Sequence, residues 1–347
     1  MFDQREFDRH EEVRLFTDRK SGLRAIIAIH STALGPAFGG CRMWPYPDDA
    51  AALADALRLA RGMTYKAAIC ELPYGGGKTV VIGDPARDKT PALLHALGRA
   101  VERLGGRYII ADDVGTTLDD LKVIGDVTRH TAARTPAARE PLGVTGYGVF
   151  MTMRAAVEHR LGRADLAGLR VAVQGLGNVG FPLCRWLHEA GASLVVADME
   201  PVRAAKAAVA FGARAVAPAL IHRQPAEVFA PCAIGGILND QSIPELAAQI
   251  VCGGANNQLA EPRHADTLAA RGILYVPDYV ANAGGVIDCH QEKIDDSPEA
   301  VLEAVGRIHA ITRDILERAT TSGQTPLAVA DAMVEARLAA ASLSRAA

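Results

Sequence analysis

The sequence lacks several features that mark whole classes of protein. It has no uninterrupted apolar run of about 18 residues, the length expected for a membrane-spanning helix. Its first residues are charged, unlike the apolar core of a secretory signal peptide. Lysine and arginine total 37 against 40 acidic residues, for a net charge of −3, and no basic block stands out. We therefore expect a cytoplasmic protein that binds neither nucleic acid nor membrane.

Recognisable metal-ligand clusters are also missing. The six cysteines form no C-x-x-C pair, and the ten histidines include no H-E-x-x-H motif, so the sequence predicts no metal site. Irregular cysteine spacing predicts reduced thiols rather than a disulfide framework. The remaining composition, 49% apolar and 22% charged over 347 residues, is ordinary for a globular enzyme of two domains.

Alternating strand and helix patterns predict an α/β fold with two domains, 1–135 and 136–324, followed by a helix at about 325–347 that packs back on the first domain. In the first region we expect strands within 12–31 and at 78–84 and 107–113, and helices at 48–66, at 90–104 and from about 118. In the second we expect a helix from 149, a βαβ unit at 169–200, short strands near 214–216, 228–234, 250–252 and 273–278, and a helical end from 298. Predicted loops are 36–47 and the glycine triplet 75–77, and the predicted linker is 134–148.

The βαβ unit carries a dinucleotide fingerprint. Gly175, Gly177 and Gly180 match G-x-G-x-x-G between a predicted strand and a predicted helix, and Asp198 ends the next strand. These glycines allow a tight turn, close approach to a pyrophosphate and close helix–strand packing, and the acid binds a ribose hydroxyl. Asp198 favours NAD over NADP because it would repel a 2′-phosphate, although Arg203 is near in sequence.

A second glycine-rich stretch, residues 63–85, does not fit a phosphate-binding loop. The P-loop frame would place a glycine at position 72, which is leucine. Lys66 and Lys78 flank the glycine triplet instead. That arrangement predicts a cationic pocket for a small carboxylate substrate, with one amine left for chemistry.

Eight segments in order resemble the amino-acid dehydrogenases that act on glutamate, leucine, phenylalanine and valine, and are most similar to the leucine and phenylalanine branch. They are GPAFGGCR (35–42), MTYKAAICELPYGGGKTVVIGDP (63–85), ADDVGTTLDDL (111–121), TGYGVF (145–150), VAVQGLGNVG (171–180), APCAIGGILND (230–240), GGANNQL (253–259) and YVPDYVANAGGVI (275–287). The resemblance implies reversible, NAD-dependent oxidative deamination of an L-amino acid to a 2-oxo acid and ammonia. It also implies a substrate cleft between an N-terminal catalytic domain and a Rossmann-like NAD domain, and a homo-oligomer.

The resemblance assigns the chemistry to a few residues. Lys66 would bind the substrate carboxylate, helped by the backbone at Gly39 and Gly40. Lys78 would be the catalytic lysine, its pKa expected to fall through desolvation and the nearby charge of Lys66. Asp113 would transfer protons to and from the amino group. Its neighbour Asp112 should point to solvent, because side chains alternate along a strand.

The remaining assignments concern the cofactor and the substrate side chain. Expected cofactor-binding residues are Thr145, Gly175, Gly177, Asn178, Val179, Gly180, Asp198, Ala255, Asn256 and Asn257. Asn257 and Asn282 would lie where nicotinamide and substrate meet. The expected substrate pocket is apolar and consists of Phe38, Ala111, Val286 and Cys289.

An apolar pocket excludes glutamate, whose side-chain carboxylate would be unpaired there. It favours leucine, valine or isoleucine, while bulky Phe38 keeps an aromatic substrate such as phenylalanine or tryptophan open. A 2-hydroxyacid dehydrogenase would need a histidine acid/base. The matching segments contain no histidine, and only residues such as His30 and His290 come near their edges. A non-catalytic protein that binds NAD or an amino acid remains a further alternative.

Overall fold

The computed structural model describes residues 4–132, 143–295 and 297–346, with the side chains of 345 and 346 excepted. Most of the predicted linker, 134–142, therefore lies outside the described residues. The chain forms two compact units: Met1–Ala138 with Val334–Ala347, and Arg139–Met333. Each contains a β-sheet and helices, so the predicted α/β class is confirmed.

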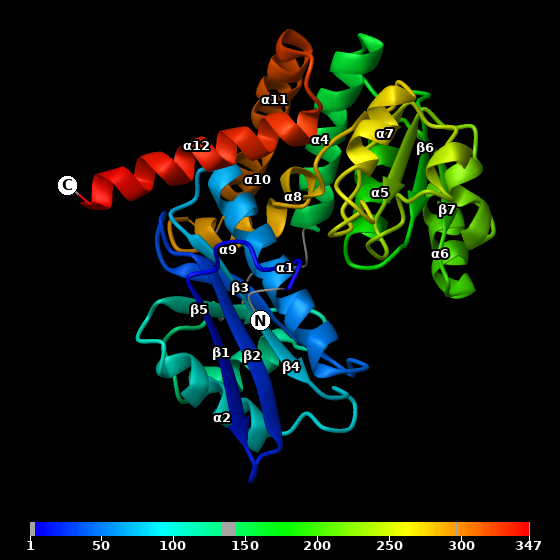
Figure 1. The fold of residues 1–347 in the computed structure, drawn as a ribbon. Coiled ribbons are helices and arrows are strands. Elements are labelled where there is room, and N and C mark those ends of the chain that lie inside the picture. Colours follow the sequence, from blue (N-terminus) through cyan, green and yellow to red (C-terminus); the bar gives the residue numbers. More distant parts are fainter. Residues whose placement is uncertain (1–3, 133–142, 296, 347) are drawn as a thin grey trace. The chain divides into compact units, whose positions relative to one another are not determined.

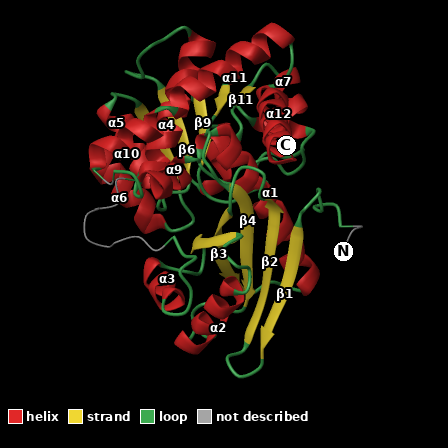
Figure 2. Ribbon diagram, turned by 90° about the vertical axis from the view of Figure 1, so that its left-hand side faces the viewer, coloured by secondary structure: helices red, strands yellow, loops and turns green. Residues whose placement is uncertain are grey.

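The first unit is built on a five-stranded sheet with the order β1-β2-β4-β3-β5 (Figures 1 and 2). Its strands are β1 (Glu12–Asp18), β2 (Leu23–Ser31), β3 (Ala37–Trp44), β4 (Gly75–Ile82) and β5 (Tyr108–Asp112). Strands β1, β2 and β4 are antiparallel neighbours, whereas β3 runs parallel to both β4 and β5. Its helices are α1 (Asp49–Ile69), α2 (Pro91–Glu102) and α3 (Leu118–Gly125).

Helices cover both faces of this sheet. On one face Ile26, Ala28 and Val80 pack against small residues of α1, which crosses the strands in Figure 1. On the other face the alternate residues of the same strands, among them Ile27 and Val81, pack against α2 and α3. Each strand is therefore apolar on both sides, as buried strands are.

Two predicted loops are strands, and the predictions were wrong there. The stretch 36–47 contains the central strand β3, and the triplet Gly75–Gly77 opens β4. A β-carbon on Gly75 would lie 1.9 Å from the Ser31 carbonyl oxygen, and one on Gly76 would lie 2.0 Å from the backbone nitrogen of Thr64. These glycines weaken an isolated strand, but here they let neighbouring backbone come close, which a sequence pattern does not reveal.

The end of the C-terminal helix α12 (Pro326–Ala346) belongs to the first unit. The Tyr65 hydroxyl donates a hydrogen bond to Glu335, and Arg9 forms an ion pair with the same carboxylate at 3.1 Å. Two residues further on, Arg337 pairs with Glu71 at 2.8 Å. These contacts join α12 to the N-terminal segment and to α1.

The second unit has a six-stranded parallel sheet with the order β11-β10-β9-β6-β7-β8. Its strands are β6 (Arg170–Gln174), β7 (Ser193–Ala197), β8 (Arg214–Ala215), β9 (Val228–Pro231), β10 (Ile250–Val251) and β11 (Leu274–Tyr275). The chain runs outward from β6 to β8 and then restarts at β9 on the other side of β6. Ligands of such sheets bind at this reversal, beyond the carboxyl ends of the strands.

Helices pack on both faces of the second sheet, and two apolar clusters divide its side chains between those faces. The helices are α4 (Val144–Leu161), α5 (Gly180–Glu189), α6 (Pro201–Phe211), α7 (His264–Ala270), α8 (Asp278–Ala281), α9 (Gly284–Gln291), α10 (Pro298–Gly306) and α11 (Ile308–Ser322). Short 3-10 helices occur at Pro218–Arg223 and Ile243–Glu245.

Candidate active site

Five of the predicted site residues share the α1 side of the first sheet. Phe38 and Gly40 alternate along β3, and Gly40 pairs in register with Ala111 of β5. Lys78 lies opposite Ala28, which packs on the α1 face. Asp113 follows β5 directly and completes the group. Parallel strands thus bring residues far apart in sequence to one place.

Lys78 and Asp113 form a close ion pair. The Lys78 Nζ donates to Asp113 Oδ2 at 2.6 Å, and Lys78 is only 5% exposed. Burial alone would raise the pKa of Asp113, but the charges of Lys78 and Arg42 outweigh it and hold that pKa well below its usual range. Asp112, the preceding residue, is exposed. A buried amino group and a partly buried, ionised carboxylate therefore meet at this position.

Gly39 and Gly40 are both required by close neighbours, and Gly40 leaves the room that this pair needs. A β-carbon on Gly40 would lie 2.8 Å from the Asp113 β-carbon and 3.2 Å from Lys78 Nζ. One on Gly39 would lie 1.7 Å from the Gly77 carbonyl oxygen. Gly39 is thus required by strand packing, whereas Gly40 forms one wall of the site itself.

Sequence reasoning missed two charged residues behind the pair. Arg42 donates from Nε to Asp113 Oδ2 at 3.1 Å and from Nη1 to Asp55 Oδ2 at 2.9 Å. Asp55 lies on α1 and is 9% exposed, between the fully buried Ala52 and Ala56. An acid at an apolar helical position was the available signal, because buried carboxylates are normally paired.

Lys66 lies in the last turn of α1 and is half-buried. Two residues earlier, the backbone of Thr64 packs directly on Gly76, so α1 is held close to β4. Helix α1 therefore carries Lys66 on the face of the sheet that also holds Lys78.

The dinucleotide turn of the second unit has three glycines in three different situations. Gly175 has a φ of 88°, which favours glycine, and a β-carbon on Gly180 would lie 1.8 Å from the Gly175 carbonyl oxygen. A β-carbon on Gly177 would have no neighbour within 4 Å. Gly175 and Gly180 are therefore explained by the fold, whereas the open space at Gly177 fits a ligand that approaches the backbone. Asn178 is exposed beside it, and Val179 precedes helix α5 without a side-chain cap.

Asp198 closes this turn from the end of β7. Its carboxylate accepts hydrogen bonds from the backbone N–H of Leu176 at 2.7 Å and of Glu200 at 2.8 Å. Arg203 forms an ion pair with Glu200 at 3.2 Å. The acid is thus fixed at the glycine turn, and the nearby arginine is turned toward another carboxylate.

The predicted asparagines gather in the loop after β10 and at the end of α8. Asn282 donates from Nδ2 to Asn256 Oδ1 at 2.8 Å, while its buried Oδ1 has no hydrogen-bond partner among the described residues. Asn257 has a φ of 52°, a left-handed conformation that asparagine tolerates. An orphaned buried carbonyl oxygen suits a carboxamide N–H donor, so this loop fits a nicotinamide.

Other predicted residues of the second unit lie around the start of α9. A β-carbon on Gly285 would come 3.2 Å from the Thr145 hydroxyl of α4. Val286 and Cys289 are 6% and 7% exposed on α9, and Ala255 is buried in the loop after β10. The structure thus brings Thr145 to the same helix as the two predicted pocket residues.

Comparison with known proteins identifies the family. A sequence model of the Glu/Leu/Phe/Val dehydrogenase dimerisation domain matches residues 6–130, and a model of glutamate/leucine/phenylalanine/valine dehydrogenase matches residues 139–201 and 196–345. The chain belongs to this family of amino-acid dehydrogenases. A resemblance based on eight short segments is thereby confirmed over most of the sequence.

Relatives of this amino-acid dehydrogenase differ in the substrate that they are named for. Leucine dehydrogenase of Bacillus subtilis is 47% identical over 332 residues, covering 95% of this chain and 91% of the relative. Valine dehydrogenase of Streptomyces albus is 46% identical over 342 residues, covering 97% and 94%. The crystal structure of L-tryptophan dehydrogenase from Nostoc punctiforme superposes with a TM-score of 0.81 at 44% identity, covering 96% and 97%. The leucine-type branch is confirmed, and the family implies a nicotinamide cofactor.

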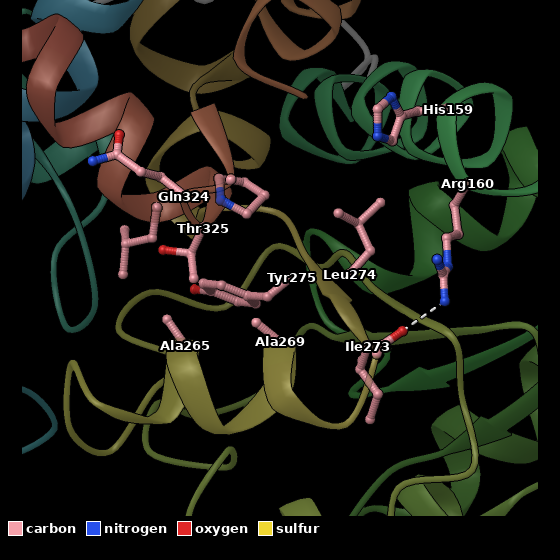
Figure 3. Close-up of a pocket in the computed structure, with 13 residues that line it drawn as sticks. His159, Arg160, Ala265, Ala269, Ile273, Leu274, Tyr275, Gln324 and Thr325 are labelled. Carbon is pink, nitrogen blue, oxygen red and sulfur yellow. Dashed lines mark hydrogen bonds between the residues drawn. The ribbon is translucent and has the colours of Figure 1, made fainter. Parts of the chain in front are cut away.

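The described part of this dehydrogenase offers neither a membrane span nor a metal-binding cluster. None of its helices there has the length and apolar character to cross a bilayer, and no group of three potential metal ligands was found. Figure 3 shows a cavity of about 250 Å³ in the second unit, between the end of α4, α7, β11 and the start of α12. It is lined by none of the predicted site residues.

Proposed function

We propose that this dehydrogenase catalyses the reversible, NAD-dependent oxidative deamination of an apolar L-amino acid of the leucine, valine and isoleucine type. The products are the 2-oxo acid and ammonia. The observation that carries the proposal is the buried Lys78–Asp113 pair, 2.6 Å apart, on the same sheet face as the apolar Phe38 and Ala111. The first unit would bind the substrate, with Lys66 on its carboxylate, and the second unit the cofactor.

The pair supplies the proton transfers that this reaction needs. Gly177, Asp198 and Asn282 would help to hold a nicotinamide cofactor, which would supply the acceptor for the hydride whose loss converts the substrate amine to an imine. Lys78, as a neutral amine, takes a proton from water as the water oxygen bonds to the resulting imine carbon. Asp113, which first accepts a proton from the substrate ammonium group, returns it to the nitrogen of the carbinolamine. The carbon–nitrogen bond then breaks, ammonia leaves, and the hydroxyl proton passes to Asp113 as the oxo group forms. In the reverse direction, the same two groups move the same protons backward.

The apolar residues favour a substrate without a second carboxylate. Phe38 and Ala111 are 3% and 6% exposed, and Val286 and Cys289 of the second unit are similarly buried. A glutamate side chain beside Phe38 and Ala111 would lose its hydration without gaining a partner. The leucine and valine dehydrogenases among the relatives support this choice.

An aromatic amino acid is the second candidate. The Phe38 ring lies 5.3 Å from that of Tyr74, centroid to centroid, which is a spacing at which aromatic rings attract. A third ring could join that pair. The similarity to an L-tryptophan dehydrogenase supports this alternative.

NAD rather than NADP is supported by the charges beside the glycine turn. The Asp198 carboxylate would accept hydrogen bonds from ribose hydroxyls and repel a 2′-phosphate. Arg203, which could have bound that phosphate, is paired with Glu200. We also propose a homo-oligomer assembled through the first unit, since residues 6–130 match a dimerisation domain.

The deciding experiment is NADH oxidation with ammonium and a panel of 2-oxo acids. The panel holds 4-methyl-2-oxopentanoate, 3-methyl-2-oxobutanoate, phenylpyruvate, indolepyruvate, 2-oxoglutarate and pyruvate, and NADPH replaces NADH in a parallel series. We expect ammonium-dependent turnover led by the two branched acids and weak with NADPH. Preference for the aromatic acids would favour the second candidate. Absence of ammonium-dependent turnover on all six would refute both.

A further inference from the structure

Arg42 joins Asp113 to a second buried acid in the first unit. Its guanidinium contacts Asp113 at 3.1 Å and Asp55 at 2.9 Å, and these three side chains are 20%, 21% and 10% exposed. Arginine is suited to such a position because its donors form a rigid planar fork. The two carboxylates therefore define the orientation of the guanidinium as well as its place.

Asp55 is itself held from two further sides. The Tyr46 hydroxyl donates to Asp55 Oδ2 at 2.6 Å, and Arg58 donates to Oδ1 at 2.9 Å. Burial would raise the pKa of Asp55, but the Tyr46 hydrogen bond and the charges of Arg42 and Arg58 lower it overall. Asp55 is thus an ionised anchor on the rigid helix α1.

Arg42 and Lys78 both donate to the same oxygen of Asp113, Oδ2. The two cations differ in one respect that matters for catalysis. The lysine must become a neutral amine to accept a proton, and at that moment it no longer offsets the charge of Asp113. The guanidinium cannot be deprotonated in a protein, so it remains as the cation beside the carboxylate.

We propose that Arg42, anchored by Asp55, is a positioning residue that keeps the Asp113 carboxylate in place beside Lys78 while protons move. It acts through Asp113 and needs no contact with the substrate. The proposal rests on the proposed function, because it presupposes that Lys78 and Asp113 carry out the proton transfers.

Two buried titratable side chains near Asp113, those of Cys41 and Tyr108, are neutral over the working range. Burial raises the pKa of the Cys41 thiol to about 12, and burial raises the pKa of the Tyr108 hydroxyl far above its ordinary value. Asp112 is exposed to solvent. The charges that act on Asp113 at close range are therefore those of Lys78 and Arg42.

The test is the pH dependence of kcat for amino-acid oxidation in Arg42→Gln and Arg42→Lys. Loss of one positive charge makes nearby groups hold their protons more tightly, so in Arg42→Gln the acid-side limb should move up by about one pH unit. The kcat at its optimum should fall about 10- to 100-fold because the carboxylate is no longer positioned. Arg42→Lys retains the charge but not the fork. The acid-side limb of its kcat–pH profile should stay at the wild-type pH, and its kcat should fall less than that of Arg42→Gln.

Arg58→Gln is the matched control, since it removes an arginine from Asp55 without touching Asp113. The acid-side limb of the kcat–pH profile of Arg58→Gln should remain at the wild-type pH. A wild-type limb in folded Arg42→Gln would overturn the proposal, and if that variant fails to fold, a wild-type kcat in Arg42→Lys would overturn it. A wild-type protein without ammonium-dependent turnover would instead refute the proposed function, and this proposal with it.

Discussion

A β-carbon on Gly40 would lie 2.8 Å from the β-carbon of Asp113, closer than two such carbons approach in proteins. Gly40 therefore determines where the Asp113 side chain can lie. The same missing β-carbon leaves space beside Lys78 Nζ, which would be 3.2 Å away. The ion pair exists in this form because this position of β3 carries no side chain.

Gly40→Ala should displace Asp113 and lower kcat about 10- to 100-fold, because small misplacements of catalytic groups are costly. Steady-state kinetics measure the change in kcat, and a thermal melt separately measures any change in stability. Gly62→Ala is the matched control, since its β-carbon meets nothing within 4 Å in helix α1. That variant should keep wild-type kcat and gain up to about 1 kcal/mol of stability. Equal kcat in both variants would contradict the role given to Gly40.

Lys78→Ala should lower turnover by about 100-fold or more while NADH binding is retained, because it removes the amine proposed to accept the proton. Turnover is followed by NADH absorbance and binding by NADH fluorescence titration. Lys122→Ala removes a surface lysine that pairs with Asp119 and should leave both unchanged. Wild-type turnover in Lys78→Ala would exclude the proposed mechanism.

Gly177→Ala should weaken NADH binding about tenfold or more, equivalent to about 1.4 kcal/mol, without lowering the melting temperature. The protein has room for this methyl group, so only a ligand would meet it. Gly180→Ala offers the opposite case, because its β-carbon would lie 1.8 Å from the Gly175 carbonyl oxygen. It should cost about 1–3 kcal/mol of stability. An unchanged Kd for NADH in Gly177→Ala would place the pyrophosphate elsewhere.

His30 should make the first unit sensitive to acid. Burial, with the charge of His10, lowers the pKa of His30 from 6.5 to about 4. The unfolded chain therefore binds a proton at His30 more readily than the folded chain does. The contribution of His30 to the free energy of unfolding is fully present above pH 6.5 and is lost as the pH falls toward 4. This lowers the free energy of unfolding by about 3 kcal/mol at most.

The measurement is urea unfolding at pH 7 and pH 5 for wild type and His30→Gln. The variant should lose less of its free energy of unfolding between these values. His95→Gln, which changes a partly exposed histidine, should keep the wild-type difference. If His30→Gln also keeps it, the acid sensitivity has another source.

The sequence predicted the second unit better than the first. The features recognised in the second unit are close together in sequence, whereas those missed in the first unit depend on residues far apart in sequence. The turn at Gly175 and the acid at Asp198 lie within one βαβ unit, so their spacing could be recognised directly. Strand β3 was missed because its glycines and flanking prolines are typical of loops, and only contacts with β4 and β5 make it a strand. Arg42 and Asp55 were missed because each has an ordinary neighbourhood in sequence, and their partner Asp113 comes much later.

Helix α12 makes the first unit discontinuous, since its final part comes from residues that follow the whole second unit. During synthesis, Tyr65 and Glu71 would leave the ribosome long before Glu335 and Arg337, their hydrogen-bonding and ion-pairing partners. The sheet of the first unit can form early, but these contacts have to wait for the last helix. Completion of the first unit is thereby tied to completion of the entire polypeptide.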